Sequence, residues 1–245
     1  MKVSIITLCH NTLDHMKNCF NNLTVHTEGI GMDKEWIVVD NNSSDELLIN
    51  YFKYMEKYPG VKIIRNEQNL TFAIGNNQAV KEAQGKWLCF LNSDTIPQRR
   101  WLEELLDCAE RNNADIVGAR MYFPHTEMIQ HAGIVQREDG IFTHRYYNQP
   151  ANKHKDIMEE SEMMVTAACM LIKKSVFEEL GNFDEGYVWG YEDVDLNLKA
   201  ISKDIKIFYC PKAFLYHTEH GTDQNINKSF DINLKLLNKK WGVLK

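Results

Sequence analysis

Features that would assign a function at once are missing from this 245-residue sequence. No apolar run reaches the roughly 18 residues that a membrane-spanning helix requires, so we expect no transmembrane segment. A strand pattern begins at Val3, which leaves no room for a signal peptide. We therefore expect a cytoplasmic protein, and a peripheral association with the inner face of the membrane stays open.

Paired cysteines are also missing. The six cysteines form no C-x-x-C pair and are scattered, mostly within apolar stretches. This distribution is typical of reduced thiols in the core of a cytosolic protein, and not of a disulfide framework or a zinc site.

Basic residues are too few for a nucleic-acid-binding protein. There are 28 Lys and Arg against 34 Asp and Glu, which gives a formal net charge of −6. No basic stripe exists to release phosphate counterions, so nucleic acid is not an expected partner. The G-x-G-x-x-G motif of NAD-dependent dehydrogenases and the G-x-x-x-x-G-K-[ST] phosphate loop are absent as well. An acidic chain of this kind needs a metal ion or local donors to hold an anionic nucleotide.

Short apolar segments alternate with helical patterns in the first half of the sequence. Strands are expected over 3–8, 36–40, 61–64, 87–91 and 115–118, and helices over 13–25, 45–58, 72–83 and 100–111. This alternation predicts βαβ units and an α/β fold with a central, mostly parallel sheet flanked by helices.

The pattern changes after about residue 120. Strands are expected over 128–136, 165–172 and 205–209, helices over 174–180 and 192–202, and an amphipathic segment over 230–241. The polar stretch 137–160 is expected to be a long loop or flap. No linker divides the chain, so we expect a single domain over residues 1–245.

Two acidic side chains follow the ends of predicted strands, where ligands bind in open α/β sheets. Asp94 comes after an apolar strand and suits a divalent cation, because one carboxylate can anchor Mg²⁺ or Mn²⁺ when phosphates and waters complete the coordination. A turn before Pro97 explains Asp94 equally simply. Asp40 can accept hydrogen bonds from a base or ribose, or it can cap the following helix.

Adjacent carboxylates begin the predicted helix 192–202. Asp193 lies in its first turn, where the helix dipole and free N–H groups favour a charged carboxylate that could take a proton from a hydroxyl. Glu192 lies beside it, and Trp189 could stack on a sugar. Acidic residues in a first turn are often purely structural, and aromatic residues near a helix start are often core.

Histidines offer further candidates. His217 follows the last predicted strand and could complete a metal site with Asp94. A lone histidine in a loop is more often structural. His131, within Gln130–Gly133, is a weaker candidate for the site.

Taken together, these segments resemble the inverting family 2 of nucleotide-sugar glycosyltransferases, which have the GT-A (Rossmann-like) fold. The resemblance extends over almost the whole chain and is nearest to the rhamnosyltransferase-like members. Its motifs occur in the family's order: Ser4–Thr7 with His10-Asn11, Val38–Asp45, Asn69–Asn77, Phe90–Asp94, Gln130–Gly133, Tyr191–Asp195 and His217.

The resemblance implies a donor side. Thr7 and Asp40 would contact the nucleoside and Asn77 would border the donor site. Asp94 would bind Mn²⁺ or Mg²⁺ on the diphosphate, with His217 as a second metal ligand. The donor would be a nucleoside-diphosphate sugar, with UDP- or dTDP-sugars first, bound mainly by a nucleotide-binding half (1–120).

Two positions depart from the family pattern. Asn92 stands where many relatives carry the first Asp of an Asp-X-Asp motif, which leaves Asp94 as the carboxylate ligand there. Thr71 stands where a Gly is often found, so the conformation of the donor loop is open.

The resemblance also implies an acceptor-binding half (121–245). Asp193 would be the catalytic base, assisted by Glu192. Trp189, Glu192 and His131 would contact the acceptor, a hydroxyl of a glycan or of a surface protein. The reaction would be a single displacement that inverts the anomeric carbon.

Two alternative functions would need different sequence features. A nucleotidyltransferase of similar fold needs a glycine-rich basic loop, which Leu8–Thr12 does not provide. A non-catalytic nucleotide-sugar or glycan-binding module would not need the Glu192-Asp193 pair, so slow hydrolysis of a donor would separate it from an enzyme.

Overall fold

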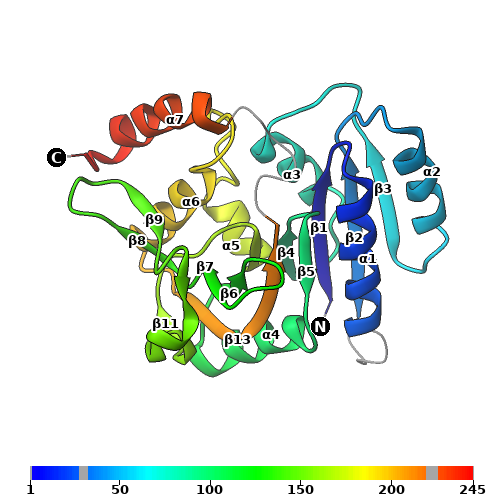
Figure 1. Ribbon diagram of the computed structural model, residues 1–245. Coiled ribbons are helices and arrows are strands. Elements are labelled where there is room, and N and C mark those ends of the chain that lie inside the picture. Colours follow the sequence, from blue (N-terminus) through cyan, green and yellow to red (C-terminus); the bar gives the residue numbers. More distant parts are fainter. Residues whose placement is uncertain (1, 28–32, 219–225, 245) are drawn as a thin grey trace.

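The computed structural model describes residues 2–27, 33–218 and 226–244. The first half alternates strands and helices as expected: β1 (Val3–Cys9), α1 (Leu13–Thr27), β2 (Lys34–Asp40), α2 (Glu46–Met55), β3 (Val61–Arg65), α3 (Phe72–Val80), β4 (Trp87–Leu91), β5 (Thr95–Pro97) and α4 (Trp101–Asn112). In Figure 1 these elements occupy the right-hand part of the molecule, except α4, which lies at its lower middle.

The second half is richer in short strands. It contains β6 (Ile116–Tyr122), β7 (Met128–His131), β8 (Ile134–Gln136), β9 (Phe142–His144), β10 (Gln149–Pro150), the 3₁₀ helices η1 (Ala151–Lys153) and η2 (Lys155–Met158), β11 (Ser161–Glu162), β12 (Cys169–Lys173), α5 (Lys174–Glu179), α6 (Glu192–Ile201), β13 (Ile207–His217) and α7 (Ile226–Trp241).

One large sheet joins the two halves. Its main strand order is β10-β7-β6-β12-β4-β1-β2-β3. The strands β4, β1, β2 and β3 run parallel to one another, and β13 runs parallel to β6. β12 is antiparallel to both of its neighbours, β4 and β6. The expected α/β fold with a central, mostly parallel sheet flanked by helices is confirmed.

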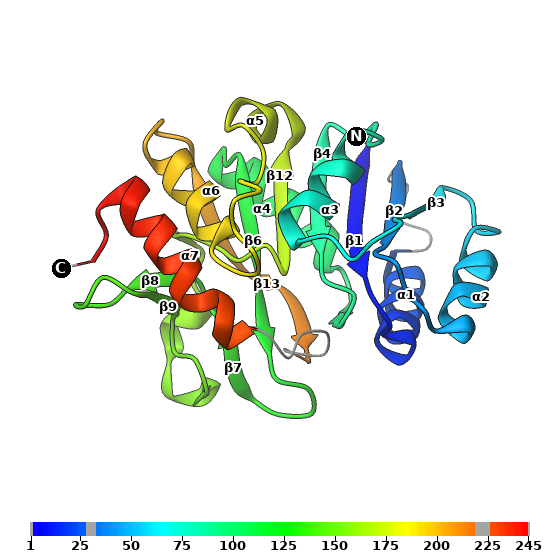
Figure 2. The same ribbon diagram turned by 90° about the horizontal axis from the view of Figure 1, so that it is seen from above.

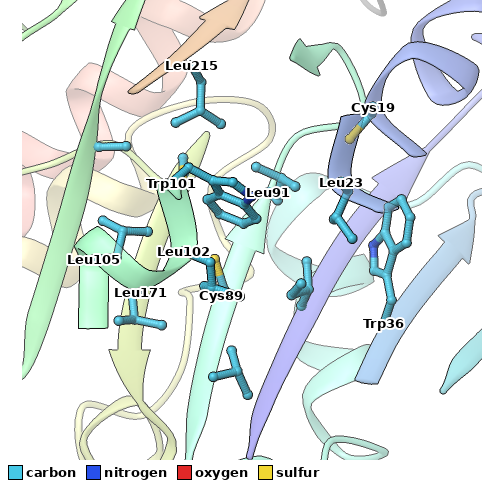
Figure 3. Packing of buried hydrophobic residues seen from close by; sticks show 14 of the residues in the cluster. Cys19, Leu23, Trp36, Cys89, Leu91, Trp101, Leu102, Leu105, Leu171 and Leu215 are labelled. Atoms are coloured by element: carbon cyan, nitrogen blue, oxygen red, sulfur yellow. The ribbon is translucent and has the colours of Figure 1, made fainter. Parts of the chain in front are cut away.

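Alternate side chains of each central strand enter different hydrophobic clusters, because neighbours on a strand point to opposite faces. Ile5 of β1 belongs to a cluster that includes Phe20 of α1 and Trp101 of α4, whereas Ile6 belongs to one that includes Phe177 of α5. Figure 3 shows part of the first cluster, with Trp101 beside Leu91 and Leu215. The sheet is thus buried on both faces.

A third, smaller cluster attaches the C-terminal helix. Leu237 of α7 is buried with Val194 of α6, Tyr187 and Ile134 of β8. Figures 1 and 2 show α7 lying over α6 and the β8–β9 hairpin. The amphipathic segment expected over 230–241 is therefore the greater part of a docked helix.

Three expected elements of the second half were wrong in extent. The last strand does not end before Pro211 but continues to His217, because a shift in register between Cys210 and Phe214 accommodates the proline. The expected strand 128–136 is broken at Gly133, which has a φ of 101°, into β7 and β8. Residues 165–168 precede β12 instead of belonging to it.

The stretch 137–160 is more structured than the expected loop. It contains β9, β10 and both 3₁₀ helices. Its backbone is fixed to the large sheet where the hydroxyl of Tyr209 donates a hydrogen bond of 2.9 Å to the carbonyl of Ile157. Polar and aromatic residues do not alternate regularly in this stretch, so the sequence did not predict these short elements.

All six cysteines are free and buried. Cys108, Cys210 and Glu160 place one ligand atom each within 4.8 Å of one another. Both oxygens of Glu160 are already hydrogen-bonded, one to Arg111 and the other to Asn112.

Within the described ranges, no helix has the length and apolar character needed to cross a membrane.

Candidate functional site

A pocket of about 500 Å³ opens beyond the carboxyl ends of β1 and β4. The two halves of the chain both contribute to its walls. The lining residues come from β1 and the turn after it (Leu8–His10), the turn after β4 (Asn92–Asp94), the β8–β9 hairpin and its flank (Ile134, Phe142–His144, Tyr147), the segment before β12 (Thr166–Ala168), the start of α6 (Trp189–Val194), the end of β13 (His217), and Asn41, Phe72 and Phe230.

Five of the nine site residues expected from the sequence line this pocket: Asp94, Trp189, Glu192, Asp193 and His217. They come from separate parts of the fold. Asp94 and His217 belong to the turn after β4 and the end of β13, whereas the other three belong to the start of α6 and the loop before it. The pocket therefore brings together the candidate metal ligands and the candidate base.

Asp94 and His217 form a direct pair. The Nε2 atom of His217 lies 3.1 Å from Oδ1 of Asp94, and both side chains are buried. β5 pairs with β13 so that His217 is opposite Thr95, which fixes this approach. The backbone N–H of Thr218 also donates to the carbonyl of Asp94, at 3.1 Å.

Gln130 of β7 orients the imidazole. Its Oε1 lies 2.7 Å from Nδ1 of His217, and its amide nitrogen donates to the His217 carbonyl at 3.1 Å. Because an amide oxygen can only accept, Nδ1 must carry a proton. The amide nitrogen of Asn92 is 3.4 Å from Nε2, in a position to donate to it.

These contacts direct the lone pair of Nε2 toward the Asp94 carboxylate. Two electron-rich atoms at this distance repel each other unless a proton or a cation lies near both. When the proton is on Nε2, burial raises the pKa of Asp94, but the charge and hydrogen bond of His217, with smaller contributions from a backbone hydrogen bond and His15, bring it below its usual value. One carboxylate oxygen and one imidazole nitrogen, held by an outer hydrogen bond, suit Mn²⁺ or a similar ion.

Glu192 and Asp193 line the pocket from the first turn of α6. Asp193 is half-buried, and its Oδ2 accepts a hydrogen bond of 3.2 Å from the backbone N–H of Ala167. Its Oδ1 accepts from the N–H of Val194 at 2.8 Å. These contacts fix the carboxylate against the segment before β12.

Glu192 is only 6% exposed. Burial, and secondarily the neighbouring charge of Asp193, raise the pKa of Glu192 to about 8. Near neutral pH Glu192 can therefore hold a proton, which suits it to donate a hydrogen bond to a substrate oxygen.

Thr7 and Asp40 are not among the described residues that line the pocket. The hydroxyl of Thr7 accepts a hydrogen bond of 2.9 Å from the indole N–H of Trp36 within the core. Asp40 accepts from the N–H of Ser43 at 2.9 Å and forms an ion pair with Arg65. The neighbouring residue Asn41 faces the pocket instead.

Asn77 and His131 also lie behind the pocket walls. Asn77 bonds both the N–H and the carbonyl of Phe183, at 3.2 and 2.9 Å. His131 is fully buried, and its Nδ1 lies 2.7 Å from Nδ1 of His144, which does line the pocket. Burial, and then His144, lower the pKa of His131 well below its usual value.

Sequence reasoning missed several residues of the site. Gln130 and His131 are neighbours on β7 and point to opposite faces, so only one of them could reach His217. The four residues of β7 are too few to predict which of these two side chains faces His217. Tyr147 and Phe230 lay in segments without a recognisable motif, and only their aromatic character signalled a binding wall, whereas His144 was a weak candidate from the sequence and does line the pocket.

Comparison with known proteins identifies the family. Residues 4–181 match the sequence model of the family described as Glycosyl transferase family 2. Curated relatives include an uncharacterized protein of Sinorhizobium fredii (31% identical, over 77% of this chain and 21% of that protein) and the O-antigen biosynthesis protein RfbC of Myxococcus xanthus (28%, over 90% and 18%). The chain thus spans about a fifth of the length of these two relatives.

Another relative is closer in length. The low-salt glycan biosynthesis hexosyltransferase Agl10 of Haloferax volcanii is 23% identical over 97% of this chain and 74% of its own. Among solved structures, GalNAc-T7 with UDP, GalNAc and Mn²⁺ superposes with a TM-score of 0.71 at 18% identity, covering 89% of this chain and 44% of that one. TarS of S. aureus does so with a TM-score of 0.67 at 19% identity, covering 98% and 65%. At these identities the superpositions show the fold.

The contact between Thr7 and Trp36 predicts that Thr7→Val destabilises the protein without weakening nucleotide binding. The variant leaves the buried indole N–H without its acceptor, which costs about 1–3 kcal/mol in free energy of unfolding. Denaturant unfolding measures the loss, and it should vanish when Thr7→Val is made in a Trp36→Phe background. Weaker nucleotide binding with unchanged stability would instead support a direct contact from Thr7.

The raised pKa of Glu192 predicts a pH-dependent stability difference. The folded protein binds this proton more tightly than the unfolded chain, in which a glutamate has a pKa of about 4.3. The stability that results is present below that value and is lost as the pH rises through about 8.

Glu192→Gln stays neutral throughout, so its melting temperature relative to wild type should rise between pH 5 and pH 9. Glu46→Gln, at an exposed first-turn glutamate of α2, is the matched control and should show little change. A constant difference between Glu192→Gln and wild type across this range would contradict the raised pKa.

Proposed function

We propose a reaction for this chain, which belongs to glycosyl transferase family 2 and is a glycosyltransferase. The chain would transfer a sugar from a nucleoside-diphosphate sugar to a hydroxyl group, with inversion at the anomeric carbon. One observation carries the proposal: the Asp94–His217 pair and the Glu192-Asp193 pair line the same pocket. A leaving group can be bound at the first pair while a hydroxyl is deprotonated at the second.

The donor diphosphate is proposed to bind on the wall with Asp94 and His217. These two side chains would hold Mn²⁺ or Mg²⁺. When bound, such an ion neutralises the negative charge that develops on the departing diphosphate. Gln130 accepts a hydrogen bond from Nδ1 of His217, so the other ring nitrogen, Nε2, is the atom that would bind the ion.

The nucleoside is proposed to lie at the ends of β1 and β2. His10 and Asn41 line the pocket there. Thr7, Asp40 and Asn77 would support this side from behind: Asp40 holds the turn after β2, and Asn77 holds α3 against Phe183. Residues 1–120 would then supply most of the donor site and residues 121–245 most of the acceptor site.

The acceptor hydroxyl is proposed to approach Asp193, the general base. The N–H of Ala167 fixes its carboxylate, so the base needs little reorganisation before it takes the proton. Glu192 and Trp189 would orient the sugars. His131 would act through His144, its hydrogen-bond partner in the pocket wall.

The identities of donor and acceptor are proposed from relatives. GalNAc-T7 was crystallised with UDP and Mn²⁺, which supports a UDP-sugar ahead of a dTDP-sugar. The relatives RfbC and Agl10 are named for O-antigen and glycan biosynthesis, which supports a glycan acceptor over a surface protein. A rhamnosyltransferase-like activity and a cytoplasmic location, with peripheral contact to a membrane, remain part of the proposal.

Asp193→Asn should abolish transfer while it leaves nucleotide binding nearly intact. The amide has the same shape as the carboxylate but cannot accept the proton, and a general base contributes about 10²–10⁴-fold to the rate. Product formation from a panel of UDP- and dTDP-sugars with glycan acceptors measures the effect.

Asp204→Asn, at an exposed residue just beyond the other end of α6, is the matched control. More than about a tenth of wild-type activity in Asp193→Asn would remove Asp193 from the role of base. A wild-type chain that binds nucleotides but neither transfers nor hydrolyses any donor would be a binding module.

Removal of divalent metal should stop turnover and weaken donor binding. Stabilisation of the protein by UDP or dTDP, which grows with ln(1 + [L]/Kd), should require Mn²⁺ or Mg²⁺ and disappear with a chelator. Asp94→Ala should reduce this metal-dependent shift in melting temperature, whereas Asp107→Ala, on the exposed side of α4, should not. Equal shifts with and without metal would count against the proposed donor site.

A further inference from the structure

The C-terminal helix α7 lies beyond the residues that match the family model, which end at 181. One of its side chains, Asn233, is completely buried although it is polar. A buried carboxamide is costly unless its donors and acceptor are all bonded. The contacts of Asn233 therefore indicate what this helix does.

The side chain of Asn233 bonds to the loop just before the Glu192-Asp193 pair. Its Nδ2 donates to the carbonyls of Trp189 and Gly190 at 2.8 and 2.9 Å. Its Oδ1 accepts from the N–H of Val188 at 3.1 Å. One side chain thus binds three consecutive residues.

The loop has a conformation that needs such support. Gly190 has a φ of 89°, and Tyr191 has a φ of 71°, in the left-handed region that few residues other than glycine adopt. Backbone of this kind persists where its surroundings hold it in place. Because Glu192 follows directly, the path of the loop sets where α6 begins and where its two carboxyl groups point.

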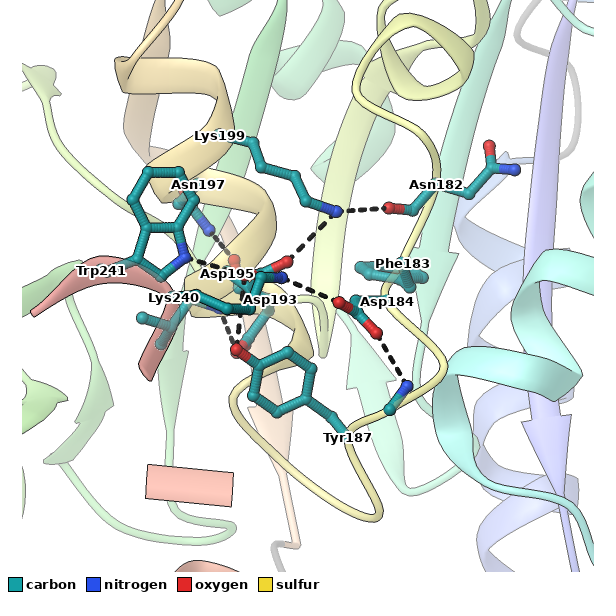
Figure 4. A network of polar contacts seen from close by, with 12 residues as sticks. Asn182, Phe183, Asp184, Tyr187, Asp193, Asp195, Asn197, Lys199, Lys240 and Trp241 are labelled. Carbon is teal, nitrogen blue, oxygen red and sulfur yellow. Dashed lines mark hydrogen bonds and ion pairs between the residues drawn. The ribbon is translucent and has the colours of Figure 1, made fainter. Parts of the chain in front are cut away.

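A second group of contacts attaches α7 to the same region. Figure 4 shows Tyr187, Lys240 and Trp241 converging on Asp195 of α6. The indole N–H of Trp241 donates to Oδ1 of Asp195 at 2.9 Å, and Lys240 pairs with the same carboxylate. Asp195 is completely buried, so these contacts fix the far end of α7 to α6.

We propose that Asn233 is a positioning residue for acceptor transfer, and that α7 holds the acceptor wall of the pocket in its working shape. Trp189, from the loop before α6, and Phe230, from α7, both line that wall. Asn233 touches no reacting atom. It acts through the backbone of Val188–Gly190 on Trp189 and on the Glu192-Asp193 pair. This inference rests on the proposed function.

Asn233→Ala tests the inference by separating transfer from donor binding. Transfer to the acceptor should fall by about 10²-fold, the order expected when a catalytic group is misplaced by about 1 Å. The affinity for UDP with Mn²⁺ should stay within about twofold of wild type, because the hydrogen bonds of the Asn233 side chain go to Val188, Trp189 and Gly190 and not to Asp94 or His217.

Asn238→Ala is the matched control. It removes the same side chain from the same helix, where Asn238 accepts a hydrogen bond from the chain's own Leu244. Transfer by this variant should stay close to wild type. If Asn233→Ala does not fold, Asn233→Ser is measured in its place, because serine keeps a hydroxyl donor for one carbonyl. Its transfer rate should fall below that of wild type but remain measurable.

Hydrogen exchange gives a readout that does not depend on activity. The N–H of Val188 should exchange about tenfold faster in Asn233→Ala than in wild type or Asn238→Ala, because its acceptor is gone. An unchanged Val188 N–H, or transfer and UDP affinity that fall in parallel, would overturn the inference. If the wild-type chain neither transfers nor hydrolyses any donor, the proposed function fails, and the exchange rate alone decides whether Asn233 holds the loop.

Discussion

The approach of His217 to Asp94 is the contact on which the pocket depends. The two residues are 123 positions apart, and they meet because β13 passes Pro211 through a bulge and then pairs with β5 directly after Asp94. Without the bulge, the proline would end the strand before it reached the carboxyl ends of β1 and β4. Gln130 then selects the imidazole tautomer. A backbone irregularity and one amide thus create the strongest candidate metal site of the pocket.

The Glu192-Asp193 pair depends on two opposing effects, the helix dipole and burial. The first turn of α6 supplies N–H groups that favour negative charge, yet burial makes Glu192 resist ionisation. Glu192 therefore keeps a proton to a higher pH than an exposed glutamate does. Asp193, in the same turn, is half-buried and accepts a hydrogen bond from the backbone N–H of Ala167. Two adjacent carboxyl groups thus have different surroundings.

Much of the fold could be predicted from the sequence, because apolar periodicity and turn residues are local signals. The strands β1 to β4 and the helices between them were expected within a few residues. What failed required contacts between distant segments: the course of β13 beyond Pro211, the break at Gly133, and the short strands of 137–160. In the site, Asp94, Trp189, Glu192, Asp193 and His217 line one pocket, whereas Thr7 and Asp40 bond to Trp36 and Arg65, two contacts that no local pattern revealed.

The contact of Asn77 with Phe183 has a mechanical consequence. The carboxamide of Asn77, on α3, holds both backbone groups of Phe183, at the beginning of the segment that ends at Glu192. The other end of that segment is held from α7. A segment attached at both ends to different parts of the protein cannot swing as an independent flap. Any widening of the pocket on this side must therefore displace whole helices, so we expect slow, collective opening and not rapid loop motion.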